Sequence, residues 1–109
     1  MPEDFPSIDV FELELWRRNQ RDCLLLDVRE PWETALCLIE GSLTIPMGQI
    51  PDHTLELPQD CPIVVICHHG MRSLRIVNFL HGSGLNNAIN LDGGIDAWAA
   101  EIDPTLNRY

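Results

Sequence analysis

The stretch IVVICHHGMRS, residues 63–73, decides how the fold is interpreted. Its first four residues are β-branched and uniformly apolar, which predicts a strand that is buried on both faces. A helical pattern begins near Ser73, so the loop from Cys67 onwards joins the end of a central strand to the start of a helix. Ligands of parallel sheets bind beyond the carboxyl ends of the strands, and Cys67 stands at such an end.

Short strands and helices alternate along the rest of the chain. Strands are predicted at residues 23–26, 43–45, 63–66 and 87–91. Helices are predicted at residues 7–19 with Ser7 as the N-terminal cap, at 32–38 after Pro31, from near 73 to between 82 and 84, and after Gly93-Gly94. Residues 51–58 are predicted to be irregular, with one helical turn. This alternation is typical of an α/β domain with a largely parallel sheet.

The size and composition of the chain indicate one folded domain. With 109 residues, 45% of them hydrophobic, the chain can form a core without disulfides or a structural metal, so we expect a single domain over residues 1–109. It contains no run of about 18 apolar residues, and we therefore expect no contact with a membrane. The acidic start lacks the pattern of a secretory signal, which favours a cytoplasmic protein.

The charge balance limits the choice of partner. The formal net charge is −10, from 17 acidic and 7 basic residues, and all seven basic residues are arginines. We expect no nucleic-acid partner, because phosphate binding requires a basic patch. The overall field also opposes an anionic substrate, which would need local attraction from backbone amides and one or two arginines.

The chain has four cysteines, Cys23, Cys37, Cys61 and Cys67, and their spacing contains neither a C-x-x-C pair nor a zinc-finger pattern. We expect free thiols. The first three are interpreted as small, mostly buried hydrophobic residues. Cys67 allows two interpretations: an inert residue that ends a buried strand, or a thiolate that the following loop stabilises.

Several features of the loop favour the thiolate of Cys67. The start of the helix presents unpaired N–H groups, Gly70 allows an unusual backbone conformation, and Arg72 adds a permanent cation. A purely structural turn does not need these three features together. His68 and His69 are expected to face solvent and to shape the mouth of the pocket.

Metal binding and hydrolase chemistry have weaker support. Cys67, His68 and His69 are consecutive, and adjacent side chains of a tight loop rarely converge on one ion. His53 and His81 lie in unrelated segments. The two loop histidines also directly follow Cys67 in the sequence, which gives little support for either as its partner in a catalytic triad. We therefore expect no metal and no cofactor.

Four segments of the chain resemble the motifs of single-domain rhodaneses, which are sulfurtransferases. Residues 25–33, LLDVREPWE, resemble D-V-R-x-x-x-E, and residues 39–46, IEGSLTIP, resemble I-x-G-[AS]-x-x-I-P. Residues 67–73, CHHGMRS, resemble C-x-x-G-x-R-[SA], and residues 90–98, NLDGGIDAW, resemble L-x-G-G-x-x-A-W. The order and spacing match from about residue 7 to residue 100, and the four segments together are specific.

The resemblance implies a three-layer fold, with a central five-stranded parallel sheet and helices on both faces. It implies that Cys67 attacks the outer sulfur of a donor such as thiosulfate, forms a persulfide, and passes the sulfur to cyanide, a thiol or a sulfur-relay protein. Arg72 would favour the negative head of the donor. Asp27 and Arg29 would support the loop through charged hydrogen bonds, with a solvated turn as the alternative for Arg29. The substrate would be bound by the loop residues His68, His69, Gly70, Met71, Arg72 and Ser73.

Other functions remain open on the same fold. Related phosphatases and arsenate reductases use a C-x5-R loop, whereas the shorter C-x4-R loop found here matches a single sulfur atom better. A binding or regulatory module usually lacks the cysteine, but a relay fed by a protein donor stays open, with the acidic surface docking a basic partner. The chain also departs from the family in having Cys37 and Leu38 where Gly-His is common, and Cys37 is a candidate second redox thiol.

Overall fold

The computed structural model describes residues 6–109, so the first five residues of the expected domain 1–109, with part of the acidic start, lie outside the described residues. The strands are β1 (Ser7–Ile8), β2 (Leu24–Asp27), β3 (Leu43–Thr44), β4 (Ile63–Ile66) and β5 (Ala88–Leu91). The helices are α1 (Val10–Arg18), α2 (Pro31–Thr34), α3 (Met71–Gly82) and α4 (Gly94–Glu101). Two 3₁₀ helices, η1 (Met47–Asp52) and η2 (Thr54–Glu56), lie between β3 and β4.

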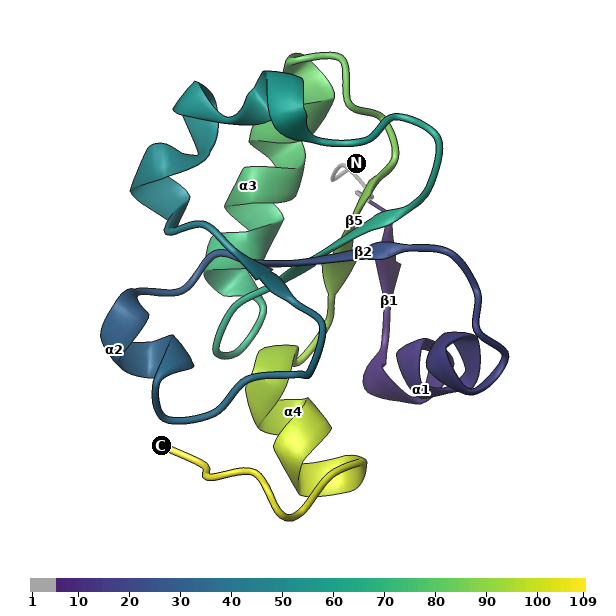
Figure 1. The fold of residues 1–109 in the computed structure, drawn as a ribbon, viewed down its shortest axis with the longest axis vertical. Helices are drawn as coiled ribbons and strands as arrows, with labels where there is room; N and C mark the ends of the chain where they lie inside the picture. Colours follow the sequence, from purple (N-terminus) through teal and green to yellow (C-terminus); the bar gives the residue numbers. More distant parts are fainter. Residues whose placement is uncertain (1–5) are drawn as a thin grey trace, which may run out of the picture.

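The five strands form one sheet in the order β1-β5-β4-β2-β3, and every pairing is parallel. Figure 1 shows α3 on one side of this sheet and α1 and α4 on the other. The predicted α/β fold, with a five-stranded parallel sheet between helices, is confirmed. Within residues 6–109, no helix is both long enough and apolar enough to cross a bilayer.

Strand β4 lies at the centre of the sheet, and all four of its residues are fully buried. Ile63 and Val65 pack into the core cluster that includes α3 residues, whereas Val64 and Ile66 pack into the cluster with α1 and α4. A strand covered on both faces needs an apolar side chain at every position, which explains its uniform composition.

The first helix begins later than predicted. Ser7 and Ile8 form β1 and pair with β5 instead of starting a helix. The N-terminal cap of α1 is Asp9, whose carboxylate accepts a hydrogen bond from the Glu12 N–H at 2.9 Å. Serine and aspartate are both good caps, and the strand pairing of Ser7 decides between them.

Three other boundaries differ from the sequence-based expectation. Helix α3 begins at Met71, two residues before Ser73, because Gly70 adopts φ 106° and forms its N-cap. Helix α2 ends at Thr34 rather than at residue 38. The region before β4 contains two 3₁₀ helices where one helical turn within residues 51–58 was expected. The strands at residues 24–27, 43–44 and 88–91 agree with the prediction to within one residue.

Candidate active site

Cys67 follows β4 directly, at the carboxyl end of the central strand, and only 1% of its surface is exposed. The start of α4 packs tightly behind it. A Cβ atom on Gly94 would lie 2.4 Å from the carbonyl oxygen of His68 and 2.5 Å from that of Cys67. These carbonyls accept hydrogen bonds from the N–H groups of Ile95 (to Cys67, 2.9 Å) and Asp96 (to His68, 3.0 Å). Helix α4 therefore holds the back of the loop.

Three groups converge on the Cys67 sulfur. The backbone N–H groups of Gly70 and Ser73 donate to Sγ at 3.1 and 3.3 Å, and the Ser73 Oγ atom lies 3.2 Å from it. The Ser73 hydroxyl donates its own proton to Asn90 Oδ1, so it is placed to accept from the Cys67 thiol. Two amide donors directed at one sulfur stabilise negative charge there, which favours a thiolate over an inert thiol.

Arg72 is held by a buried carboxylate. Its Nη1 and Nη2 atoms each donate to a Glu33 oxygen at 2.7 Å, and the Glu33 side chain is 3% exposed. These bonds, followed by smaller contributions from Glu30 and Tyr109, lower the pKa of Glu33 to about 2. The resemblance assigned Arg72 to the negative head of a donor, but its guanidinium already has a carboxylate partner.

Asp27 and Arg29 form a second buried pair at the end of β2. Arg29 Nη2 donates to Asp27 Oδ2 at 2.7 Å, Nε donates to Oδ1 at 2.9 Å, and both side chains are fully buried. Arg29 also donates to the carbonyl oxygens of Glu33 and Cys37 and to the hydroxyl of Tyr109. The solvated-turn alternative for Arg29 is therefore wrong. Its connection to the loop runs through Tyr109 and Glu33.

His68 packs among rings instead of facing solvent. Its ring stacks on Tyr109, with centroids 3.8 Å apart and planes 5° apart, and also contacts the ring of His69 at 3.9 Å. Its Nε2 atom is buried and has no hydrogen-bond partner among residues 6–109. Burial, and then the neighbouring His69, lower the pKa of His68, which keeps the ring neutral at pH 7. The solvent-facing prediction is wrong for His68.

His69 does face solvent, with 63% of its side chain exposed. Ligand atoms of His68, His69 and Asp96 lie within 4.8 Å of one another, which brings together three residue types that can bind metals. Both Asp96 oxygens, however, accept hydrogen bonds from Arg108, each at 3.1 Å. An ion at this cluster would have to compete with the Arg108 guanidinium.

Glu33, Asn90 and Tyr109 also belong to this site, although the sequence did not predict their roles. Glu33 occupies the last position of the D-V-R-x-x-x-E pattern, and its side chain accepts from the Glu30 N–H in a capping box, so the motif did contain a signal. Asn90 and Tyr109 reach the site only through tertiary packing. Asn90 is 17 residues from its partner Ser73, and Tyr109 is 76 residues from its partner Glu33.

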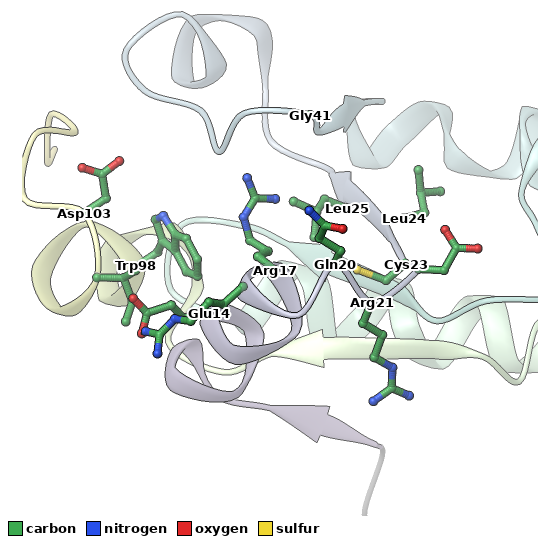
Figure 2. A pocket seen from close by; sticks show the side chains of 13 residues that line it. Glu14, Arg17, Gln20, Arg21, Cys23, Leu24, Leu25, Gly41, Trp98 and Asp103 are labelled. Atoms are coloured by element: carbon green, nitrogen blue, oxygen red, sulfur yellow. The ribbon is translucent and has the colours of Figure 1, made fainter.

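A separate hollow lies at the opposite end of the strands from Cys67 (Figure 2). It has a volume of about 770 Å³ and opens at the amino end of β2, beside α1 and the end of α4. Its lining combines carboxylates with three of the seven arginines: Glu14, Asp22, Asp103, Arg17, Arg18 and Arg21. This hollow is distinct from the site of Cys67, which lies at the carboxyl ends of the strands.

Known proteins resemble this chain over most of its length. The model of the rhodanese-like domain family matches residues 12–101. A sulfurtransferase of Allochromatium vinosum is 38% identical over 93 residues, which are 85% of this chain and 87% of that protein. The putative sulfurtransferase YtwF of Bacillus subtilis is 39% identical over 80 residues, 73% of this chain and 77% of that protein. In the probable adenylyltransferase/sulfurtransferase MoeZ of Mycobacterium tuberculosis, 35% identical over 100 residues, the match covers 90% of this chain but 26% of the longer relative.

Solved structures agree with the sequence matches. A rhodanese-like domain protein from Staphylococcus aureus superposes with a TM-score of 0.83 at 31% identity, over 95% of this chain and 98% of that one. The protein SSP1007 from Staphylococcus saprophyticus gives a TM-score of 0.81 at 35% identity, over 94% and 99%. The named sulfurtransferases support sulfur transfer as the general activity. On these matches the chain belongs to the rhodanese-like domain family.

Proposed function

We propose that this protein is a thiosulfate sulfurtransferase-type enzyme that carries sulfane sulfur as a persulfide on Cys67. The observation behind the proposal is the convergence of the Gly70 and Ser73 N–H groups on Cys67 Sγ, at 3.1 and 3.3 Å. The thiolate and the persulfide are both anions, so fixed amide donors suit both states of the cycle. Relatives named as sulfurtransferases support the same chemistry.

In the first half-reaction the Cys67 thiolate attacks the outer sulfur of the donor. A new S–S bond forms, the S–S bond of thiosulfate breaks, and sulfite leaves with the bonding electron pair. The terminal sulfur of the resulting persulfide carries the negative charge. The step is a displacement at sulfur and requires no separate oxidant.

In the second half-reaction a thiophilic acceptor attacks the terminal sulfur of the persulfide. Cyanide leaves as thiocyanate and a thiolate leaves as a persulfide, while the electron pair of the broken bond returns to Cys67. The enzyme is then ready for another donor. We expect ping-pong kinetics, because the first product departs before the acceptor reacts.

The residues around Cys67 have supporting roles in this proposal. Gly70, with φ 106°, turns the loop so that its own N–H points at the sulfur. Arg72 ties the start of α3 to α2 through Glu33. Ser73 supplies the second amide donor, and its hydroxyl can accept a hydrogen bond from the thiol in the resting state.

The remaining predicted site residues line the entrance or support the loop. In this proposal His69 and Met71, which are exposed, border the path of donor and acceptor, and His68 lies beside that path under the Tyr109 ring. Asp27 and Arg29 act at a distance in this proposal, because their buried network reaches the loop through Tyr109 and Glu33.

A second candidate is a relay in which a protein persulfide, rather than thiosulfate, is the natural donor. Two observations favour it. Arg72 is neutralised by Glu33, so the site offers a dianion little local attraction. Trp32, which contacts the Tyr109 ring, and Met71 in the loop are 63% and 70% exposed, and large exposed apolar side chains suit a protein partner.

The intact mass of the protein tests the proposal. Wild type and Cys67→Ser are incubated with thiosulfate and then with cyanide. We expect a gain of about 32 Da, the mass of one sulfur, in wild type only, and its loss after cyanide. The Cys67→Ser variant is the matched control, since the other three cysteines are unchanged.

Each outcome assigns the protein to one class. No gain with thiosulfate, but a gain with a cysteine desulfurase as donor, would identify the relay. No gain with either donor would contradict sulfur transfer. Turnover of a phosphate ester or arsenate by the same preparation would then favour the phosphatase or arsenate reductase alternative.

A further inference from the structure

The segment that follows α4, residues 103–109, returns to the Cys67 loop, where Tyr109 stacks on His68. Figure 1 shows it running from the end of α4 back toward α2. Leu106 packs against the core cluster of α1 and α4, and Asn107 Nδ2 donates to the Leu36 carbonyl oxygen at 3.1 Å. Arg108 binds both oxygens of Asp96 in α4. These contacts attach the segment to α4 and to the stretch that follows α2.

Tyr109 uses its ring and its hydroxyl for different contacts. The ring stacks on His68 and meets Trp32 edge-on, at 5.9 Å and 72°. The hydroxyl donates to Glu33 Oε2 at 2.8 Å and accepts from Arg29 Nη1 at 3.0 Å. Burial raises the pKa of Tyr109 to about 12, so the hydroxyl keeps its proton at neutral pH.

The two sets of contacts reach both ends of the loop that surrounds Cys67. The ring covers His68, the next residue in the chain. The hydroxyl reaches Arg72 through Glu33, and Arg72 directly precedes the second N–H donor to the sulfur. A displacement of either end would turn an amide donor away from Sγ.

We infer that Tyr109 is a positioning residue of this site: its ring and hydroxyl hold the two ends of the Cys67 loop, so that the amide donors stay directed at the sulfur. Its effect on sulfur transfer rests on the proposed function. Its effect on the reactivity of Cys67 does not, because alkylation of the sulfur needs no sulfur donor. Nothing in the loop motif itself encodes this contact, since Tyr109 lies 76 residues from Glu33.

Two substitutions separate the roles of the ring and the hydroxyl. Tyr109→Phe keeps the ring and removes both hydroxyl bonds, whereas Tyr109→Leu removes the stack as well. Thr105→Ala is the matched control, because Thr105 lies in the same segment and, within residues 6–109, its side chain and N–H both bond with Asp103. Alkylation of Cys67 by iodoacetamide is followed against pH, with the Cys67 peptide quantified by mass spectrometry so that the other cysteines do not interfere.

We expect the pH of half-maximal alkylation to move upward by about one unit in Tyr109→Leu, by less in Tyr109→Phe, and not at all in Thr105→Ala. Persulfide formation in a single turnover should slow about tenfold in Tyr109→Leu. A shift of the midpoint, rather than a change in rate alone, separates loss of thiolate stabilisation from easier access to the sulfur.

Equal midpoints for wild type, Tyr109→Phe and Tyr109→Leu would overturn the inference. If Tyr109→Leu fails to fold, Tyr109→Phe decides, because it preserves the packing of the ring. If wild type takes no sulfur from thiosulfate but the midpoints shift as expected, the proposal of thiosulfate as donor is wrong. The positioning role of Tyr109 is then still supported. An equal shift in Thr105→Ala would assign the effect to the segment as a whole and not to Tyr109.

Discussion

At the scale of single residues, the contacts of a buried cysteine's sulfur separate a candidate nucleophile from a packing residue. Cys67 and Cys37 are both buried. The Cys37 sulfur accepts one long hydrogen bond, at 3.8 Å from Arg29 Nη1, whereas the Cys67 sulfur accepts two shorter ones from backbone N–H groups. At Cys23 and Cys61, burial raises the pKa of the thiol, which leaves less of the nucleophilic thiolate at pH 7. The reactivity proposed for Cys67 therefore comes from the backbone of its loop.

The Ser73 hydroxyl gives a direct test of this local environment. In Ser73→Ala the amide donor remains, but the hydroxyl at 3.2 Å from Sγ and its bond to Asn90 are lost. We expect single-turnover persulfide formation to slow by up to about tenfold, because the lost bond to Asn90 no longer anchors Ser73, whose N–H donates to the sulfur. Ser42→Ala is the control, because the Ser42 hydroxyl donates to the Ile39 carbonyl oxygen outside the site. An unchanged rate in Ser73→Ala would show that the amides alone are sufficient.

Glu33 should make the stability of the protein depend on acid pH. Since Arg72 lowers the pKa of Glu33 to about 2, the carboxylate stabilises the folded state fully above pH 4.5, and this contribution disappears as the pH falls toward 2. Its size is on the order of 2–3 kcal/mol. Glu33→Gln should lower the free energy of unfolding at pH 7 and flatten its decline between pH 4.5 and 2. Urea unfolding at several pH values measures this, and identical pH profiles for the two proteins would refute it.

At the scale of elements, the sequence predicted those strands, turns and helices that depend on a local pattern of residues. The uniform β-branched composition of β4 and the glycine at position 70 were enough to place a strand, a tight turn and a helix in order. In α1 the buried residues are Val10, Leu13 and Trp16, three apart, whereas Phe11 and Leu15 are exposed. Hydrophobic residues on both faces concealed that spacing. The start of the helix was misplaced because Ser7 pairs with β5 and the cap is Asp9.

The part of the site that the sequence did not predict consists of contacts between distant elements. The aromatic stack of His68 and the carboxylate partner of Arg72 depend on how α2 and the segment after α4 pack around the loop. Local propensity and spacing carry no information on such packing. The motif identified the residues of the loop, but the ion pair that neutralises Arg72 was seen only in the structure.

The packing of α4 against the Cys67 loop requires a glycine at position 94, and Gly82 in α3 offers a matched control. In Gly94→Ala the new Cβ would meet the backbone oxygens of Cys67 and His68 at 2.5 and 2.4 Å, and the residue would keep φ 62°. Backbone atoms cannot yield as a flexible side chain can, so we expect a loss of about 2–4 kcal/mol in unfolding free energy. In Gly82→Ala, the new Cβ would meet no atom of residues 6–109 within 4 Å beyond the backbone of its own helix, so this change should be neutral or slightly stabilising. Thermal or urea unfolding of the two variants side by side checks this, and similar stabilities would contradict it.

At the scale of the whole molecule, the net charge decides whether an anionic donor is attracted or repelled. The net charge is −10, and three arginines near the Cys67 loop are each bound to a carboxylate. The pairs are Arg29 with Asp27, Arg72 with Glu33, and Arg108 with Asp96. A dianion such as thiosulfate therefore meets repulsion over long distances and gains little from these pairs at short range. A donor of low charge, or a basic protein, avoids this cost.

This view predicts the effect of salt on the reaction with thiosulfate. Raising the ionic strength from about 0.01 M to about 0.15 M shortens the Debye length from about 30 Å to about 8 Å, which screens the repulsion. We expect the KM for thiosulfate to fall by about two- to fivefold in wild type, with kcat nearly constant. Glu33→Gln is the informative comparison, because it removes one negative charge and leaves Arg72 without its carboxylate partner. Its KM at low salt should be lower than that of wild type and should fall less as salt is added. A KM that rises with salt in wild type would mean that the site attracts the dianion, and that Arg72 acts on the donor despite its pairing with Glu33.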